Sequence, residues 1–421
     1  MPALATPVDS PATGIPNSRS RTVPAPFGVR AEVHPNALVR WTFYLSIFTI
    51  PFSYLYVPGT GGHVGVVRIV QALMLFAIFS QPRVCLRLVP TALFWFLGYI
   101  TVRIIWGLWL APDMARLWWP SSREFIEYLP WFWVMFNVLQ YRETRRGGLW
   151  ALGLGFSVCA ACHIAGIGVT EVNNGFGNRT TVFGMNANEL GGSYAAAMIA
   201  LLGLWMHVPR TLMQRLLPLP LMAFMGVAMA ETGSRTAIVV FLMGTFILFF
   251  MGKSYESRLK RVASLILCVA VLASILWQIP TVMERFAELN IHDIGQHNPR
   301  ARMAPVLWDM FLQSPVFGLG PDNYDFKLTR EAMPYLIDQG QLIESHNLAL
   351  LLLVETGIIG FLLYTMGFRM PLVTAWKARL KSGPLPLALL LPFAIIALTI
   401  SNPIHDMTLW VAMAYGLVGA V

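Results

Sequence analysis

The chain has 421 residues, of which 56% are hydrophobic and only 12% are charged, and its mean hydropathy is +0.60. Soluble domains carry about 25% charged residues, so this composition excludes a soluble globular surface. It also excludes intrinsic disorder, a coiled coil and a disulfide scaffold as the main architecture. We interpret the chain as an all-α, polytopic helical membrane protein.

The apolar runs divide the chain into an N-terminal tail, two groups of membrane helices and one long loop. Residues 1–36 are rich in Pro, Ser, Thr and Ala and lack a signal-peptide core, which predicts a disordered tail. A membrane helix needs about 20 apolar residues. Nine transmembrane helices are predicted in 37–280 and three in 346–421, separated by the loop 281–345. The twelve spans are 38–57, 64–80, 89–110, 125–140, 149–170, 188–207, 216–231, 235–251, 262–280, 346–368, 384–401 and 406–421.

The net charge of +9 is explained by where the 30 Lys and Arg residues lie. Alternate connections between the spans hold 19 cations, whereas the opposite set holds nine. Positive charge is retained on the cytoplasmic side of a membrane, so the basic set, with both termini, is predicted to be cytoplasmic. The basicity is therefore topological, and it does not indicate binding to nucleic acid.

Cofactor motifs are weak in this sequence. The four cysteines cannot form a disulfide framework, and the pair Cys159 and Cys162 lies on a predicted membrane helix without a second pair. His292 and His297 with one Asp make a poor zinc site. Gly318-Leu319-Gly320 is neither a phosphate-binding loop nor a dinucleotide fingerprint. We therefore predict no metal, no nucleotide and no other cofactor.

The loop 281–345 is long for a compact fold and is predicted to carry function. The segments TVMERFAELN and RMAPVLWDMFLQ have helical apolar spacing, while SPVFGLGPDNYDF is a Pro/Gly turn region. We expect short amphipathic helices that lie over the outer ends of the bundle.

Two arginine motifs on the predicted external face are candidates for anion binding. Ser234 and Arg235 lie in the turn TGSRTA between two spans, where Arg235 either extends to lipid headgroups or binds a substrate. Arg300 and Arg302 precede an apolar, Trp-containing helix, and they contact either headgroups or a phosphate. Arginine suits phosphate because its planar fork donates bidentate hydrogen bonds and keeps its charge.

A histidine at the end of the long loop is the candidate general base. His346 lies in ESHNL, directly before an apolar run, with Ser345 as the expected N-cap. A helix N-terminus disfavours the imidazolium form, so it would keep His346 neutral and able to accept a proton. The alternative is a structural histidine that caps the helix. His405-Asp406 at the last span is a weaker site, because Asp is favourable at any helix N-terminus.

Read together, these motifs resemble the O-antigen ligase/polymerase superfamily of bacterial envelopes. The resemblance rests on GSR between two spans, the Arg-rich stretch before a Trp, SPVFGLGPDNY, and ESHNLALLLLVETGIIG at the start of a membrane helix. The specific motifs cover about residues 235–360. Each motif is weak alone, but their order on one predicted face is specific.

The resemblance implies a membrane glycosyltransferase, GT-C-like and inverting, that uses neither metal nor nucleotide. Such enzymes move a glycan from undecaprenyl diphosphate to an acceptor at the outer face of the bacterial inner membrane. It implies catalytic roles for Arg235, for His346 and for an arginine of the 300–302 stretch, where we favour Arg302 over Arg300. Asp406, and with it Ser234 and Asn347, would contact the diphosphate or the acceptor.

Several activities within this resemblance remain open. We expect an O-antigen ligase that joins undecaprenyl-diphosphate-linked O-antigen to lipid A-core, because of the overall size and the single external loop. An O-antigen polymerase and a protein O-oligosaccharyltransferase are alternatives with the same motifs. A secondary transporter or flippase is the alternative from another class, and Arg68 and Arg103 inside predicted spans would support it. No internal repeat supports a transporter.

Overall fold

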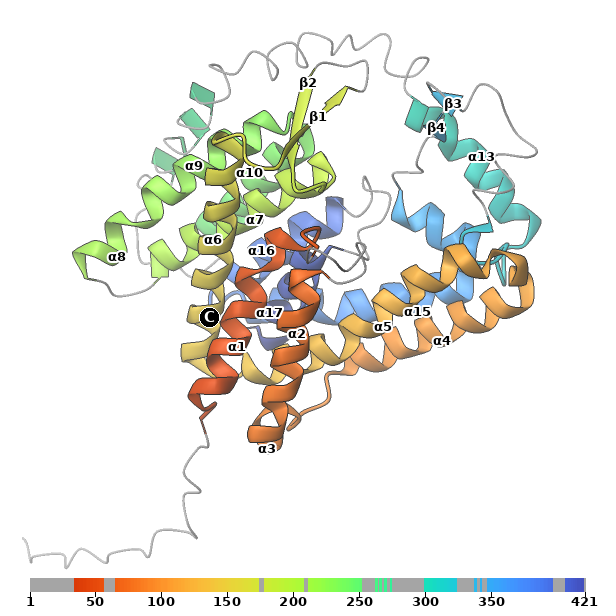
Figure 1. The fold of residues 1–421 in the computed structure, drawn as a ribbon, viewed down its shortest axis with the longest axis horizontal. Coiled ribbons are helices and arrows are strands. Elements are labelled where there is room, and N and C mark those ends of the chain that lie inside the picture. Colours follow the sequence, from red (N-terminus) through yellow and green to blue (C-terminus); the bar gives the residue numbers. More distant parts are fainter. Residues whose placement is uncertain are drawn as a thin grey trace, which may run out of the picture. The chain divides into compact units, whose positions relative to one another are not determined.

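The computed structural model describes residues 34–56, 65–173, 178–207, 211–251, 299–323, 347–396 and 406–419, with short pieces of 262–274, 337–338 and 341–342 (Figure 1). Contacts separate an N-terminal segment, residues 1–34, from the unit Pro35–Val421. The predicted tail 1–36 lies almost entirely outside the described residues. So do most of the predicted span 262–280 and the predicted helix TVMERFAELN.

Helices form at each of the other eleven predicted spans. The first group is α1 (Ala37–Phe48), α2 (Val66–Ala77), α3 (Pro82–Cys85), α4 (Thr91–Leu110), α5 (Ala115–Val138) and α6 (Arg142–Ile164), with 3-10 turns η1 (Ile50–Phe52), η2 (Ile78–Ser80) and η3 (Pro112–Met114). The second group is α7 (Ala187–His207), α8 (Leu212–Leu216), α9 (Pro218–Glu231), α10 (Arg235–Phe250), α13 (Pro299–Gln313), α15 (Leu348–Ala378), α16 (Leu385–Ile396) and α17 (Met407–Val418).

The helix α5 begins ten residues before the predicted span, and it continues through Pro120. The reason is tertiary packing around Trp118, which is buried in the first turns of this helix. Its indole N–H donates a hydrogen bond to Ala111 O, and its ring packs on Gly107 of α4. This contact holds the helix where the sequence suggested a connection. The helix α13 confirms the predicted amphipathic helix at 302–313.

Sheet structure is limited, in the described residues, to two antiparallel hairpins. Strand β1 (Val169–Asn173) pairs with β2 (Asn178–Val182), and β3 (Ile337–Asp338) pairs with β4 (Gln341–Leu342). The predicted span 149–170 therefore ends early, because α6 stops at Ile164 and the chain turns through Gly166 and Gly168 at positive φ. Val and Thr dominate β1 and β2, as expected for strands. The all-α expectation holds apart from these hairpins.

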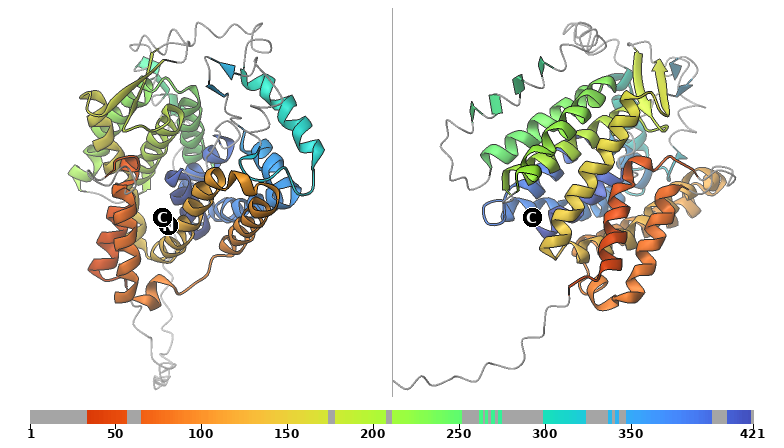
Figure 2. Two further views of the ribbon diagram at one scale, coloured as in Figure 1. Left: turned by 45° about the vertical axis from the view of Figure 1, so that its right-hand side comes forward. Right: turned by 60° about the vertical axis from the view of Figure 1, so that its left-hand side comes forward.

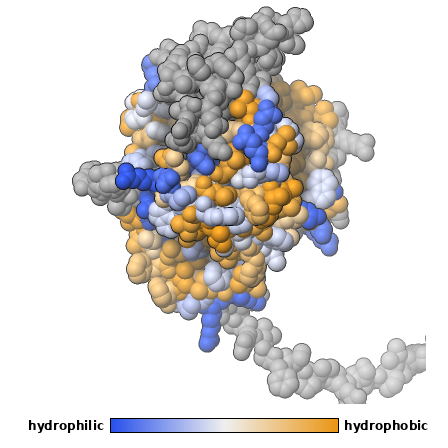
Figure 3. All heavy atoms as spheres, turned by 90° about the vertical axis from the view of Figure 1, so that its right-hand side faces the viewer, coloured by the Kyte–Doolittle hydropathy of each residue, from blue (hydrophilic) through white to orange (hydrophobic). Residues whose placement is uncertain are grey.

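The lengths and apolar composition of the helices agree with a membrane protein. Four described helices are long and apolar enough to cross a bilayer: Thr91–Leu110, Arg142–Ile164, Ala187–Met206 and Leu348–Ala378. Six other apolar helices are shorter, so the number of twelve crossings stays a prediction. Large apolar side chains such as Phe76, Phe79 and Trp109 are exposed, and apolar residues cover much of the face in Figure 3. Lipid contact accounts for this exposure.

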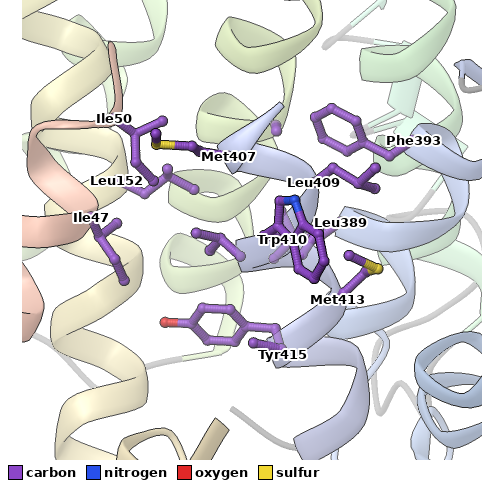
Figure 4. Packing of buried hydrophobic residues seen from close by; sticks show 14 of the residues in the cluster. Ile47, Ile50, Leu152, Leu389, Phe393, Met407, Leu409, Trp410, Met413 and Tyr415 are labelled. Carbon is purple, nitrogen blue, oxygen red and sulfur yellow. The ribbon is translucent and has the colours of Figure 1, made fainter. Parts of the chain in front are cut away.

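The core of the bundle lies around α17. Trp410 is buried and contacts the rings of Phe96, Phe125, Tyr128 and Phe132, which come from α4 and α5. Figure 4 shows this indole among apolar side chains of several helices. Beside it, α7 packs against α6, α9 and α10, drawn in yellow to green in Figure 2. The start of α7 lies next to the start of α10, at Gly191 and Ser234, and next to the start of α17, at Ser193 and Thr408.

Hydrogen bonds and ion pairs at the helix ends fall into two groups. One group joins Asn36 to Gln81, Arg40 to Glu143, Leu88 to Asn137 and Tyr415 to Arg145. The other joins Arg103 to Asp322, Arg179 to Thr232 and Ser193 to Thr408. The first group belongs to the predicted cytoplasmic set, and the second to the predicted external set. The predicted alternation of cytoplasmic and external connections requires this grouping. The side of the membrane that each group faces stays a prediction.

Candidate functional site

The GSR motif forms a tight turn between α9 and α10. Gly233 has a φ of 59°, which a glycine adopts without strain. Ser234 is the N-cap of α10, and its hydroxyl accepts a hydrogen bond from Ala237 N at 3.3 Å. Arg235 is the first residue of α10. Its side chain is exposed, and it has no hydrogen-bond or ion-pair partner among the described residues.

The turn rests against the start of α7 at Gly191. A Cβ atom at this position would lie 2.8 Å from Thr232 Oγ1 and 3.0 Å from Ser234 Cβ. Only a glycine therefore allows α7 to approach the turn this closely. Thr232 and Ser234 are buried by the contact. The backbone that carries Arg235 is thus fixed, while its guanidinium stays accessible.

Strand β2 braces the same turn. Arg179 donates from Nε to Thr232 O at 2.9 Å and from Nη2 to Asn188 Oδ1 at 2.7 Å, so one guanidinium joins the turn to α7. Thr180 donates its hydroxyl hydrogen to Glu231 O at 3.1 Å. A hydroxyl has one hydrogen, so His163 Nε2, which lies 2.8 Å from the same oxygen, must be the donor. The sequence did not indicate these supports.

Asp406 is buried at the N-cap of α17, where its carboxylate accepts a hydrogen bond from Thr408 N at 2.8 Å. The Thr408 hydroxyl lies 3.0 Å from the hydroxyl of Ser193 on α7. Asp406 therefore has the capping role that its position predicted. The helix α7 joins it to the turn that carries Arg235, because Gly191 and Ser193 lie within one turn of that helix.

A second acid, Glu189, lies near Asp406. Glu189 on α7 accepts a hydrogen bond from Tyr54, and Asp406 and Glu124 interact with it electrostatically. Tyr128 donates to Glu124 Oε1 at 2.6 Å. Among the described residues, no three His, Cys, Asp or Glu side chains are arranged to hold a metal. Glu189 inside a predicted span was an available signal, since ionisable residues at membrane depth usually have a function.

The predicted general base, His346, lies outside the described residues. The next residue, Asn347, is the N-cap of α15, and its side chain accepts a hydrogen bond from Leu350 N at 3.1 Å. The expectation that Ser345 caps this helix is therefore wrong. Both residue types are good N-caps, and the helix begins at Leu348, two residues later than a Ser345 cap would start it. His346 directly precedes the cap in the chain.

Arg300 and Arg302 lie at the start of α13, but their side chains are not described. This helix packs on the first turns of α15 through a small apolar cluster of its own. The buried members of the cluster are Met303, Leu307, Met310, Phe311, Leu319, Leu351 and Val354. The structure thus brings the arginine-bearing helix and the helix that follows His346 into direct contact.

A break in α15 receives the segment that follows α13. Gly357 has φ 63° and ψ −168°, so the helical ladder is interrupted there. The segment 314–323 replaces the missing bonds with three of its own. They run from Leu319 N to Val354 O (2.7 Å), from Gly320 N to Glu355 O (3.1 Å) and from Ile358 N to Pro315 O (2.9 Å). Two of the motifs in the resemblance, SPVFGLGPDN and VETGIIG, therefore bind each other.

A buried arginine joins this contact to the bundle. Arg103 of α4 forms ion pairs with Glu355 and with Asp322, the latter at 3.2 Å. Its Nε donates to Ser122 Oγ at 3.2 Å, and its Nη2 donates to Ser121 Oγ at 3.1 Å. The sequence pointed to Arg103 only as a residue that a transporter would use. Its partners were missed, although Glu355 interrupts a long apolar run.

Comparison with known proteins adds the family. No curated protein matches the chain. Residues 220–365 match the model of the O-antigen ligase family, and this stretch is about a third of the chain. It begins in α9, contains Arg235, Arg300, Arg302 and His346, and ends in α15 beyond the break. The resemblance identified from the motifs is thereby confirmed over this stretch, because residues 220–365 are similar to the O-antigen ligase family.

Proposed function

We propose that the protein is an O-antigen ligase, which transfers O-antigen from undecaprenyl diphosphate to a sugar hydroxyl of lipid A-core. The observation that carries the proposal is the match of residues 220–365 to the O-antigen ligase family, since this stretch holds both arginine motifs and His346. The packing of α13 on the helix that follows His346 supports it, because it places two of these motifs on adjoining elements.

The donor diphosphate binds at the starts of α10 and α13. Arg235 is the first residue of α10, and Arg300 and Arg302 lie near the start of α13. A helix N-terminus carries partial positive charge and free N–H groups, so a cation there is unfavourable unless an anion is bound nearby. The two starts together offer guanidinium forks and backbone donors for a diphosphate. Arg302 is the main ligand of the pair, and Arg300 assists it.

His346 is the general base. It removes the proton from the acceptor hydroxyl as the oxygen attacks the anomeric carbon. The bond between that carbon and the phosphate oxygen breaks, and undecaprenyl diphosphate leaves with its charge matched by the arginines. The configuration at the anomeric carbon is inverted by this single displacement. No metal or nucleotide takes part.

Ser234, Asn347 and Asp406 have supporting roles. Each of them caps a helix, which fixes the backbone next to Arg235, next to His346 and at the start of the last span. In the proposed complex, Asn347 and Ser234 contact the diphosphate, and Asp406 orients the acceptor from the start of α17. The burial of Asp406 limits this contact to a group that enters between α7 and α17.

The reaction takes place at the outer face of the bacterial inner membrane, with both termini of the multi-pass chain in the cytoplasm. The asymmetry of 19 against nine cations supports this orientation. The two groups of contacts at the helix ends agree with the alternation of the connections. Lipid-linked glycans complete their assembly on the outer face, so the donor meets the site there.

Deletion of the gene and complementation with variants test the function. The deletion should yield lipopolysaccharide without O-antigen, while lipid-linked polymer accumulates. Wild type should restore attachment, and His346→Ala and His346→Gln should not, because neither side chain accepts a proton at neutral pH. If chain length is lost but attachment persists, the activity is that of a polymerase. Loss of glycan from proteins alone indicates protein O-glycosylation.

A purified system tests the chemistry. Transfer from the lipid-linked donor to lipid A-core should proceed in EDTA, and it should not need an ion gradient. Turnover that requires a divalent ion would contradict the proposed mechanism. Movement of the intact donor across vesicles, driven by a gradient and without transfer, would instead identify a transporter.

A further inference from the structure

Protein partners bind four of the five N–H groups of the Arg103 guanidinium. Nε bonds to Ser122, Nη1 to Glu355, and Nη2 to both Ser121 and Asp322. Arg103 is 7% exposed and Glu355 is 2% exposed. A charged group at membrane depth is stable only when it is paired in this way. Because Arg103 is buried and held by these protein partners, we do not count it among the proposed catalytic residues.

The partners of Arg103 come from three separate parts of the chain. Ser121 and Ser122 belong to α5 of the bundle, Glu355 belongs to α15 just before its break, and Asp322 belongs to the segment after α13. The carboxylate of Glu355 also accepts a hydrogen bond from the Asp322 backbone N at 3.0 Å. Glu355 and Asp322 are therefore fixed to each other and, through one guanidinium, to the bundle.

The contacts of Arg103 reach the elements that carry the candidate catalytic residues, which are α13 and the first turns of α15. Leu351 and Val354 in the first turns of α15 share an apolar cluster with α13, whereas Leu348 and Leu352 of the same turns belong to the core of the bundle. The segment 314–323 connects α13 to the break by backbone hydrogen bonds. These three pieces move together, because each is bound to the other two.

We propose that Arg103, Glu355 and Asp322 are positioning residues, which hold α13 and the first turns of α15 in one place over the bundle. They thereby set the position of Arg300 and Arg302, and of His346 next to Asn347, relative to Arg235. The proposal rests on the proposed function for the catalytic part of its consequences. The attachment itself does not depend on that function.

The test removes the buried ion pair of Arg103 and Glu355, and it leaves only the carboxylate of Asp322, whose side chain is 27% exposed, without its ionic partner. In Arg103→Met with Glu355→Leu, both partners become apolar, a change that folded proteins tolerate better than the loss of one partner. The matched control is Arg68→Met with Glu127→Leu, which removes a half-exposed ion pair of 3.5 Å between α2 and α5. Both variants are purified as full chains in detergent, and their thermal unfolding is compared with wild type.

The expected result distinguishes a misplaced catalytic residue from a loss of folding stability. The Arg103/Glu355 variant should unfold near the wild-type temperature, yet its kcat for transfer from undecaprenyl-diphosphate-linked O-antigen to lipid A-core should fall about 100-fold, as for a catalytic group misplaced by about 1 Å. Its donor KM should rise as well, because Arg300 and Arg302 of α13 bind the donor diphosphate in the proposed function. Hydrogen exchange at Leu319, Gly320 and Asp322 should become faster. The control should keep both the kcat and the slow exchange.

A second variant keeps the proposal open to refutation if the double variant does not fold. Asp322 has a φ of 55°, so Asp322→Gly retains the backbone conformation while it removes the carboxylate. This variant should lose kcat and keep its unfolding temperature. A folded variant of either kind with wild-type kcat and wild-type exchange overturns the proposal, and so does an equal loss in the control.

Failure of the proposed function gives a different pattern. If wild type itself transfers no glycan from the lipid-linked donor, the ligase assignment is wrong. The exchange measurement still decides whether Arg103 and Glu355 hold the segment 314–323. Slow exchange in wild type that persists in the double variant refutes the attachment, whatever the activity.

Discussion

Gly357→Ala tests the contact between the break in α15 and the segment 314–323. The φ and ψ values of Gly357, 63° and −168°, lie in a region that is essentially reserved for glycine. A Cβ atom would lie 2.2 Å from Val316 O and 2.7 Å from Gly318 N, both backbone atoms. Ordinary contact begins at 3.4 Å, so the carbonyl of Val316 must retreat by about 1.2 Å.

The expected loss of stability combines two effects. The backbone strain of an alanine at this position costs about 1–3 kcal/mol. The retreat of the segment weakens three backbone hydrogen bonds, each worth about 1 kcal/mol net. The total, about 5 kcal/mol, is a large share of the 5–15 kcal/mol that is typical of folded proteins.

Gly383→Ala is the matched control. Gly383 also has a positive φ, 100°, but nothing lies within 4 Å of its would-be Cβ. This variant suffers the strain alone, so it should be about 3 kcal/mol more stable than Gly357→Ala. Thermal unfolding followed by tryptophan fluorescence measures the difference, which corresponds to at least about 3 °C in a chain of this size.

Hydrogen exchange locates the effect. In Gly357→Ala the peptide 314–323 should exchange faster, whereas in Gly383→Ala it should match wild type. If both variants unfold at the same temperature and the peptide stays protected in both, the close approach at Gly357 does not hold the segment, and the reasoning fails.

Arg235→Lys should lower glycan transfer at least about tenfold, because a point charge does not reproduce bidentate binding of phosphate, and full activity would contradict the role of the fork. Arg179→Lys should lose one of its two bonds, to Thr232 O or to Asn188, and lower the unfolding free energy by about 1–3 kcal/mol; an unchanged unfolding temperature would show that the brace is dispensable. In a cysteine-free background, Asn298→Cys should react with an impermeant thiol reagent in intact cells and Ser257→Cys should not, and the reverse pattern would invert the topology.

The sequence located the helices because apolar periodicity and span length act locally. In the described part of the chain, helices lie at eleven of the twelve predicted spans, and α13 lies at the amphipathic segment that contains Trp308. The turn at Gly233 and the N-caps Ser234 and Asp406 follow from residue type in the same way. A helix end needs only a side chain that accepts a hydrogen bond from the next turn.

Local signals also failed where two neighbours were equally suitable. Ser345 and Asn347 both favour an N-cap, and packing of the first turns of α15 decides for Asn347. The strands β1 and β2 were hidden at the end of an apolar run. Only the structure shows the role of this hairpin, in which Arg179 and Thr180 donate hydrogen bonds to carbonyl groups of the turn that precedes Arg235.

Only the tertiary structure revealed the partners of Arg103 and the break at Gly357. Arg103 and Glu355 are 252 residues apart in the chain, and each looks like an isolated charge in an apolar run. The run VETGIIG reads as one uninterrupted helix, because a single glycine costs a helix only about 1 kcal/mol. The helix opens at Gly357 because a segment from elsewhere in the chain supplies the hydrogen bonds that the helix loses there. Local helix propensity depends only on neighbouring residues, so it cannot predict such a distant partner.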